Sequence, residues 1–178
     1  ATHDMYLDED CGFVRESSLN GPLAAGIPGT PAGLVYLADH YGRLDLSQNL
    51  GPAIRLASEG FEVKARYHRM ANFRKHAMAE YPSTASIFLG DDGVADLGEI
   101  IKQPALANTL RLLGEHGRAG FYAGDIGKRL VAGVRAHGGI WNQQDLDHYS
   151  VVERRPIVID YRGVRIVTAP PPSSGGVV

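Results

Sequence analysis

Residues 155–178, with the sequence RPIVIDYRGVRIVTAPPPSSGGVV, decide how the rest of the chain is interpreted. Two runs of β-branched residues flank Arg162 and Gly163, which predicts two strands paired through a turn. Alternate side chains of a strand share a face, which predicts one face of Ile157, Ile159 and Tyr161 in the first strand and, likewise, one of Val164, Ile166 and Thr168 in the second. The prolines at 170–172 lack the N–H that a sheet ladder requires, so we expect the second strand to end before them.

The same stretch indicates that the protein continues. Residues 173–176, Ser-Ser-Gly-Gly, allow a tight backbone bend, and the valines at 177 and 178 begin a new apolar element. A protein seldom stops on its way into a new element. We therefore expect these 178 residues to be a piece of a longer protein.

Composition narrows the class of protein. A chain of 178 residues with 44% apolar residues can form one domain with a core. Its net charge of −2 gives no reason to expect nucleic acid or an anionic membrane as a partner. No apolar run approaches the roughly 18 residues of a spanning helix. A single cysteine, Cys11, excludes an internal disulfide and a cysteine-rich metal site.

A first helix is predicted from Thr30, whose hydroxyl can cap it, to Gly42, which can end it. Pro31 suits the first helical position. The apolar face of this helix is predicted to carry Leu34, Leu37 and Tyr41. The preceding glycines, within residues 26–34, lack the Gly-Lys-Ser/Thr ending of a phosphate loop and the spacing of a dinucleotide fingerprint. We interpret them as a tight turn into a buried helix.

Further helices follow in order. Ser47 is the predicted cap of the second helix and Gly60 its end, with an inward stripe of Leu50, Ile54 and Ala57. The third spans residues 62–80, with an inward face of Tyr67, Met70, Phe73 and Ala77. Pro104 opens a fourth with Leu106, Leu110 and Leu113 inward, and a fifth carries Ile126, Leu130 and Val134. Residues 82–98 are predicted to be a loop with a turn at 91–93, and residues 145–149 a short helical turn.

Charged stretches are interpreted as surface. The acidic residues Asp4, Asp8, Glu9 and Asp10 lack the ligand spacing of an EF-hand, so we expect a solvated loop. The third helix carries the basic residues Lys64, Arg66, Arg69, Arg74 and Lys75. No aromatic platform for nucleic acid accompanies them. We expect a solvated face or a face against an acidic partner segment.

No catalytic constellation is complete. The histidines are scattered, without a His-Glu-x-x-His motif or a close metal pair, at His3, His40, His68, His76, His116, His137 and His148. Ser173 and Ser174 follow three prolines instead of occupying the Gly-x-Ser-x-Gly turn of a nucleophile elbow, so we interpret them as turn formers. The catalytic and metal-binding motifs by themselves therefore indicate an α/β fragment without a complete active site.

The order of short blocks nevertheless resembles the middle of the large subunit of the γ-glutamyltransferase (glutathione hydrolase) family. Nine blocks carry this resemblance across nearly the whole chain: GIPGTPAGL at 26–34, YGRL at 41–44, PAIRLA at 52–57, QPALANTL at 103–110, FYAGDI at 121–126, GG at 138–139, VERRP at 152–156, YRG at 161–163 and PPPSSGG at 170–176.

The resemblance implies an N-terminal-nucleophile hydrolase. In that family a precursor cleaves itself, and a threonine becomes the first residue of the small subunit. Its hydroxyl attacks the γ-glutamyl carbonyl of a substrate such as glutathione, and its α-amine, with a pKa near 8, serves as the base. The γ-glutamyl group then passes to water or to an amino acid or peptide. No metal or organic cofactor is needed, and a periplasmic or extracellular location is implied.

No catalytic, substrate-binding or metal-binding residue of the family carries over to a position in this chain. Residues 1–5 resemble those that follow the family's Arg-Glu-x-Ala-Pro motif, whose arginine is expected to grip the substrate α-carboxylate. No segment here resembles the threonine-led small subunit, which would be the partner chain.

The implied fold class is α/β (α+β), the helix-rich part of a four-layer αββα sandwich. Within a single fragment, 1–178, we expect a leading loop at 1–29, a helical part at 30–150, and strands with the Pro-Pro-Pro-Ser-Ser-Gly-Gly turn at 151–178. The isolated chain is expected to be poorly soluble or unstable, because its strands would lack cover. The alternatives are a β-lactam acylase, a γ-polyglutamate-processing relative, and a non-catalytic helical interaction module.

Overall fold

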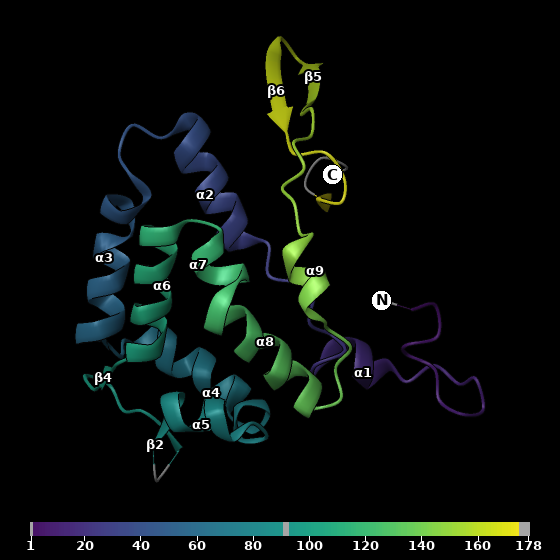
Figure 1. Ribbon diagram of the computed structural model, residues 1–178, viewed down its shortest axis with the longest axis vertical. Coiled ribbons are helices and arrows are strands. Elements are labelled where there is room, and N and C mark those ends of the chain that lie inside the picture. Colours follow the sequence, from purple (N-terminus) through teal and green to yellow (C-terminus); the bar gives the residue numbers. More distant parts are fainter. Residues whose placement is uncertain (1, 91–92, 175–178) are drawn as a thin grey trace.

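The computed structural model describes residues 2–90 and 93–174 as a body of helices from which one β-hairpin projects (Figure 1). The helices are α1 Arg15–Leu19, α2 Thr30–Tyr41, α3 Leu46–Glu59, α4 Ala65–Ala79, α5 Pro82–Phe88, α6 Pro104–His116, α7 Ala119–Tyr122, α8 Gly124–Ala136 and α9 Gln143–Asp147. The strands are β1 Phe61–Glu62, β2 Leu89–Gly90, β3 Gly93–Val94, β4 Ile100–Ile101, β5 Ile157–Tyr161 and β6 Val164–Thr168.

Helices α3 and α6 lie side by side at one edge of the body (Figure 1). The predicted stripe of α3 is confirmed in its position, because Leu50 and Ala57 are buried and Ile54 is half-buried. From α6, Leu113 is buried with 1% of its surface exposed. The short antiparallel pair of β1 and β4 joins Phe61 to Ile101 and ties the end of α3 to the start of α6.

A second packing centre joins the start of α2 to α7 and α9. Its buried members are Ala32, Tyr122, Trp141 and Leu146. Half-buried side chains of α8, among them Leu130 and Val134, pack against this cluster, as the predicted apolar stripe requires. The cluster therefore unites segments that lie about a hundred residues apart along the chain.

The predicted caps of two helices are wrong. Thr30 is the first residue of α2 and makes no capping hydrogen bond, because Gly29 occupies the cap position. A Cβ at Gly29 would lie 2.1 Å from the hydroxyl oxygen of Tyr149, so a larger residue there would force the Tyr149 ring to move. Helix α3 begins at Leu46 with Asp45 as its cap, and the Asp45 N–H donates to the Gln48 side chain at 3.3 Å.

Several predicted inward faces are also wrong. In α2 the face of Leu34, Leu37 and Tyr41 is exposed, so α2 is not a buried helix. In α4 Met70 and Phe73 are exposed, Phe73 by 78%, and in α6 Leu106 is exposed by 42%. Each of these helices buries an alanine, Ala32, Ala71 or Ala107, whose small side chain lets the helix approach its neighbour closely, and α6 also buries Leu113.

Residues 82–98 are not the loop that was predicted. Pro82 lies in the first turn of α5, where its missing N–H costs no hydrogen bond. Strands β2 and β3 then form a small antiparallel pair, with Leu89 opposite Val94. Of the predicted turn at 91–93, residues 91 and 92 lie outside the described residues.

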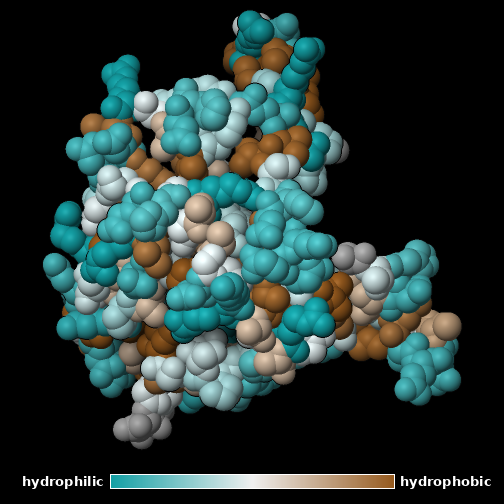
Figure 2. Space-filling model, in the orientation of Figure 1, coloured by the Kyte–Doolittle hydropathy of each residue, from teal (hydrophilic) through white to brown (hydrophobic). Residues whose placement is uncertain are grey.

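The predicted terminal hairpin is confirmed. Strands β5 and β6 are antiparallel, and Ile159 pairs with Ile166 across the ladder, as alternation requires. Strand β6 ends at Thr168, before the prolines. Figure 2 shows brown apolar side chains on this hairpin, at the top of the view, and apolar residues of both its faces are exposed: Val158, Ile159, Tyr161, Val164, Ile166 and Val167. The predicted element at 177–178 lies outside the described residues.

Candidate functional site

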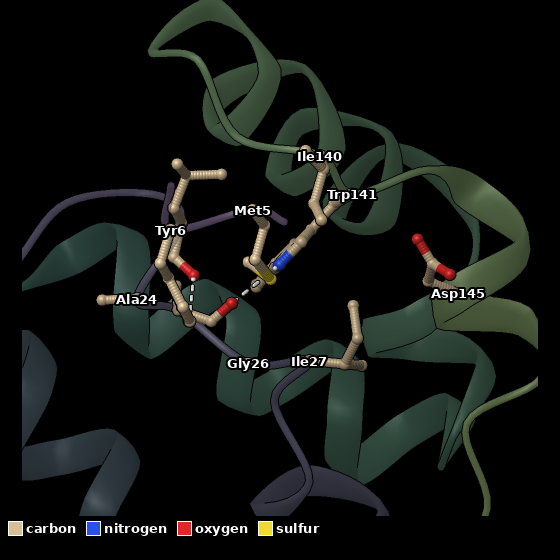
Figure 3. A pocket seen from close by; sticks show the side chains of 10 residues that line it. Met5, Tyr6, Ala24, Gly26, Ile27, Ile140, Trp141 and Asp145 are labelled. Carbon is tan, nitrogen blue, oxygen red and sulfur yellow. Dashed lines mark hydrogen bonds between the residues drawn. The ribbon is translucent and has the colours of Figure 1, made fainter. Parts of the chain in front are cut away.

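A hollow of about 290 Å³ lies between the N-terminal arm and the segment before α9 (Figure 3). Two hydrogen bonds hold its walls together: Tyr6 Oη donates to the Leu23 carbonyl at 3.2 Å, and Trp141 Nε1 donates to the Ala25 carbonyl at 3.0 Å. Its one charged group is Asp145, whose carboxylate accepts the Asn142 N–H at 2.8 Å as part of the α9 capping box. The hollow therefore has a mixed polar and apolar lining, and its lining residues include no serine, threonine, cysteine, lysine or histidine.

Tyr122 anchors the glycine-rich turn at the start of α2. Its hydroxyl donates to the Pro28 carbonyl at 2.5 Å and accepts the Ala32 N–H at 3.1 Å. Burial raises the pKa of Tyr122, which keeps the hydroxyl neutral and able to serve both partners. The turn at 26–34 thus has a structural partner in the protein itself.

Two neighbours hold the Tyr122 ring. The Tyr149 ring stacks on it with centroids 5.8 Å apart, and the Arg118 guanidinium lies 4.6 Å from its centroid. The same guanidinium donates to the carbonyls of Leu146 and Asp147 at 3.1 and 2.9 Å, which satisfies the carboxyl end of α9. Arg118 therefore has a structural role at the end of α9, in which one of its two terminal nitrogens is engaged.

A groove of about 510 Å³ runs between α2 and residues 147–151. Its titratable lining residues are Tyr36, Asp39, His40, Arg118, Asp147, His148 and Tyr149. Within residues 2–90 and 93–174, no three histidine, cysteine or carboxylate side chains are placed to share a metal ion. The residues that line the groove include no such set of metal ligands.

Beside this groove, Glu153 meets two tyrosines of α2. Tyr36 Oη and Tyr41 Oη both donate to Glu153 Oε1 at 2.8 Å. The hydrogen bonds from Tyr41 and Tyr36 hold the pKa of the Glu153 carboxyl below its usual value, and the same contact with Glu153 raises the pKa of each tyrosine. The sequence carries no signal for this cluster, because its partners lie 112 and 117 residues apart.

The other residues considered for catalysis or metal binding, the histidines and the serine pair at 173–174, do not come together at one site. His40, His68 and His137 each place Nδ1 within 3.0 Å of a backbone carbonyl oxygen, and His3 pairs with the neighbouring Asp4. Ser173 and Ser174 are exposed, and the Ser173 N–H donates to the Pro170 carbonyl at 3.2 Å, as a turn requires. Across the described ranges, no histidine or carboxylate is hydrogen-bonded to either serine.

The charged stretches lie at the surface. Asp8 Oδ1 accepts the backbone N–H groups of Asp10 and Gly12, which closes an exposed acidic loop. The side chains of Arg66, Arg69 and Arg74 project from α4 into solvent. No helix among the described residues has the length and hydrophobicity to span a membrane.

Comparison with known proteins places the whole chain in one family. The sequence model of Gamma-glutamyltranspeptidase matches residues 1–178. The chain is 41% identical over 183 residues to the glutathione hydrolase proenzyme of Pseudomonas sp. (strain A14) and 35% identical over 178 residues to that of Escherichia coli (strain K12). These alignments cover 100% and 99% of this chain but 31% of each relative, so the chain spans about a third of their length.

Solved structures agree. Helicobacter pylori gamma-glutamyltranspeptidase superposes with a TM-score of 0.95 at 35% identity, covering 99% of this chain and 51% of that one. The enzyme from Pseudomonas nitroreducens gives 0.88 at 37% identity, covering 99% and 52%. A cephalosporin acylase from Bacillus halodurans gives 0.78 at 30% identity, covering 85% and 29%. These likenesses confirm the predicted fold class, a helix-rich α+β part of an N-terminal-nucleophile hydrolase. The chain belongs to the gamma-glutamyltranspeptidase family.

Proposed function

We propose that the chain is the middle part of the large subunit of a γ-glutamyltransferase or glutathione hydrolase. The whole enzyme would cleave γ-glutamyl amides and transfer the γ-glutamyl group to water or to an amino acid or peptide. The observation that carries the proposal is the family match over residues 1–178, supported by the TM-score of 0.95 with a gamma-glutamyltranspeptidase.

In this proposal the reacting groups belong to a threonine-led chain. The threonine hydroxyl attacks the γ-carbonyl and its α-amine accepts the proton, which then goes to the departing amine. Water or an amine acceptor next attacks the resulting ester and releases the threonine. The chemistry requires neither a metal nor an organic cofactor. The 178 residues contribute support for the site and no attacking group or base.

The hairpin β5–β6 is the proposed contact with the remainder of the enzyme. A two-stranded hairpin is marginal in water, and this one exposes Ile159 and Ile166 on one face and Val158 and Val167 on the other. A further sheet layer supplied by the threonine-led chain would bury one of these faces, and another part of the enzyme would have to cover the other. The leading segment 1–29, the helical part 30–150 and the strand-bearing part 151–178 would then act as one unit within the large subunit.

A related acylase is the second candidate. It is supported by the likeness to the cephalosporin acylase, which covers less of the chain and superposes less closely than the two gamma-glutamyltranspeptidases. A transpeptidase from Bacillus anthracis, CapD, is similarly distant, with a TM-score of 0.76 over 84% of the chain. A non-catalytic helical module has no such likeness to support it.

The test uses the complete gene product. Intact-mass and N-terminal analysis is expected to reveal a second chain that begins with threonine, and the purified protein is expected to release the aniline from a γ-glutamyl anilide. A variant with the leading threonine replaced by alanine is the control, and it should remain uncleaved and inactive. Hydrolysis of a cephalosporin side-chain amide without γ-glutamyl cleavage would favour the acylase. An uncleaved, inactive protein would contradict the proposal.

A further inference from the structure

Two side chains attach the segment between α9 and the hairpin to the helical body: Tyr149, which stacks on Tyr122, and Glu153. Residues 148–156 form no regular helix or strand. Among the described residues that follow Tyr149, Glu153 alone makes a side-chain hydrogen bond to another element, and it makes two. The direction in which the hairpin leaves the body therefore depends on this contact.

The geometry of the contact suits a fixed attachment. One carboxylate oxygen, Glu153 Oε1, accepts both tyrosine hydroxyls at 2.8 Å, which uses its two lone pairs. Tyr36 and Tyr41 lie in the last two turns of α2, so the helix fixes their separation. His40 further restrains Tyr36, because the two rings stack with centroids 4.0 Å apart.

We propose that Glu153 is a positioning residue that clamps residues 148–156 onto the carboxyl end of α2 and so sets the direction of the β5–β6 hairpin. The proposal rests on the proposed function in one respect: the hairpin must meet the remainder of the enzyme for the clamp to affect precursor cleavage. The attachment itself can be measured without any activity.

The clamp depends on pH with a definite sign. The titratable groups that face the Glu153 carboxyl from the described residues are Tyr36, His40 and Tyr41, all on α2. The two hydroxyls lower the pKa of Glu153 below its ordinary 4.5, so the carboxylate clamp is fully present above that value and is lost as the pH falls through the lower, folded value. The charge of His40 also favours the Glu153 carboxylate and so acts in the same direction as the two hydroxyls.

The experiment is hydrogen exchange by mass spectrometry on the complete protein. Glu153→Ala and the double variant Tyr36→Phe, Tyr41→Phe should each speed exchange of the hydrogen-bonded amides in the last turn of α2, residues 39–42, by about fivefold, because the contact that holds this turn is lost. Exchange of α6, Pro104–His116, should not change. Asp39→Asn is the matched control, since it removes an exposed carboxylate from the same turn and, after correction for intrinsic exchange, should leave the turn unaffected.

A pH series separates the clamp from simple packing. After correction for intrinsic exchange, the last turn of α2 in the wild type should loosen only as the pH falls below 4.5, because the two hydroxyls lower the pKa of Glu153 from that value. In Glu153→Gln it should show no such transition, because the amide does not titrate. The cleavage rate of the precursor should fall in Glu153→Ala and recover in part in Glu153→Gln, whose amide oxygen still accepts a hydroxyl.

Three results would overturn the clamp: unchanged exchange in both Glu153→Ala and the double tyrosine variant, an equal increase in α6, or an unaltered pH transition in Glu153→Gln. If the wild-type protein neither cleaves itself nor turns over γ-glutamyl anilides, the proposed function fails. The exchange measurements would still show whether Glu153 holds this segment against α2.

Discussion

Replacing Tyr122 by phenylalanine tests the most connected side chain of the body. The change removes one oxygen from a residue that is only 2% exposed, and it abolishes the hydrogen bonds to the Pro28 carbonyl and the Ala32 N–H. Each lost bond within the protein costs about 0.5–1.5 kcal/mol, and a buried partner left without a bond costs about 1–3 kcal/mol. We therefore expect Tyr122→Phe to lower the free energy of unfolding by about 2–3 kcal/mol.

Urea unfolding of the complete protein measures this loss, and exchange of the Ala32 amide locates it. Tyr149→Phe is the matched control, because Tyr149 stacks on Tyr122 but its hydroxyl makes no hydrogen bond to any described residue. Its loss should stay within about 0.5 kcal/mol. Equal effects of the two substitutions, or a Tyr122→Phe protein as stable as the wild type, would refute the assignment of Tyr122 as an anchor.

Three further predictions concern packing and the uncovered surface. Gly29→Ala should destabilise the protein by about 1–3 kcal/mol, because its Cβ would lie 2.1 Å from the Tyr149 hydroxyl oxygen. Gly33→Ala, where a Cβ would meet no other atom, should instead stabilise the protein by about 0.5–1 kcal/mol. Thermal melts of the two variants will rank their stabilities. Leu113→Ala should lower the free energy of unfolding by about 2–5 kcal/mol. Leu106→Ala, on the exposed side of α6, should lower it much less, as urea unfolding will measure. The reverse order would mean that another element covers Leu106. Val167→Lys should make the isolated 178-residue chain more soluble in a sedimentation assay but block maturation of the complete protein. Normal maturation of that variant would argue against burial of this hairpin face.

Local patterns predicted much of the fold. The turn residues Arg162 and Gly163 between two alternating runs sufficed for the hairpin and its register. Leu50 and Ala57 correctly predicted the buried side of α3, because the apolar stripe of this helix packs against another helix of the body. Periodicity failed for α2, where it finds an apolar face but cannot tell whether another element covers that face.

The tertiary contacts escaped prediction for a different reason. Tyr122 meets Pro28 and Ala32 across 94 and 90 residues, and Glu153 meets Tyr36 across 117, so no local pattern connects them. Gly29, the cap of α2 in place of Thr30, lies against Tyr149, which is equally remote in sequence. We predicted that no residue of this chain is catalytic or binds substrate, and this stays a prediction. The search for a threonine-led chain and the anilide assay will test it.

The Tyr122 anchor also determines when the turn at 28–32 can form its hydrogen bonds during synthesis on the ribosome. The turn at 28–32 cannot be secured until residue 122 has been made, and the stacking ring of Tyr149 arrives later still. At roughly 5–20 residues per second, the intervening 90 residues take about 5–18 s. During that interval the exposed leucines of α2 stay attached to a turn without its anchor, which makes the nascent chain a candidate for chaperone binding.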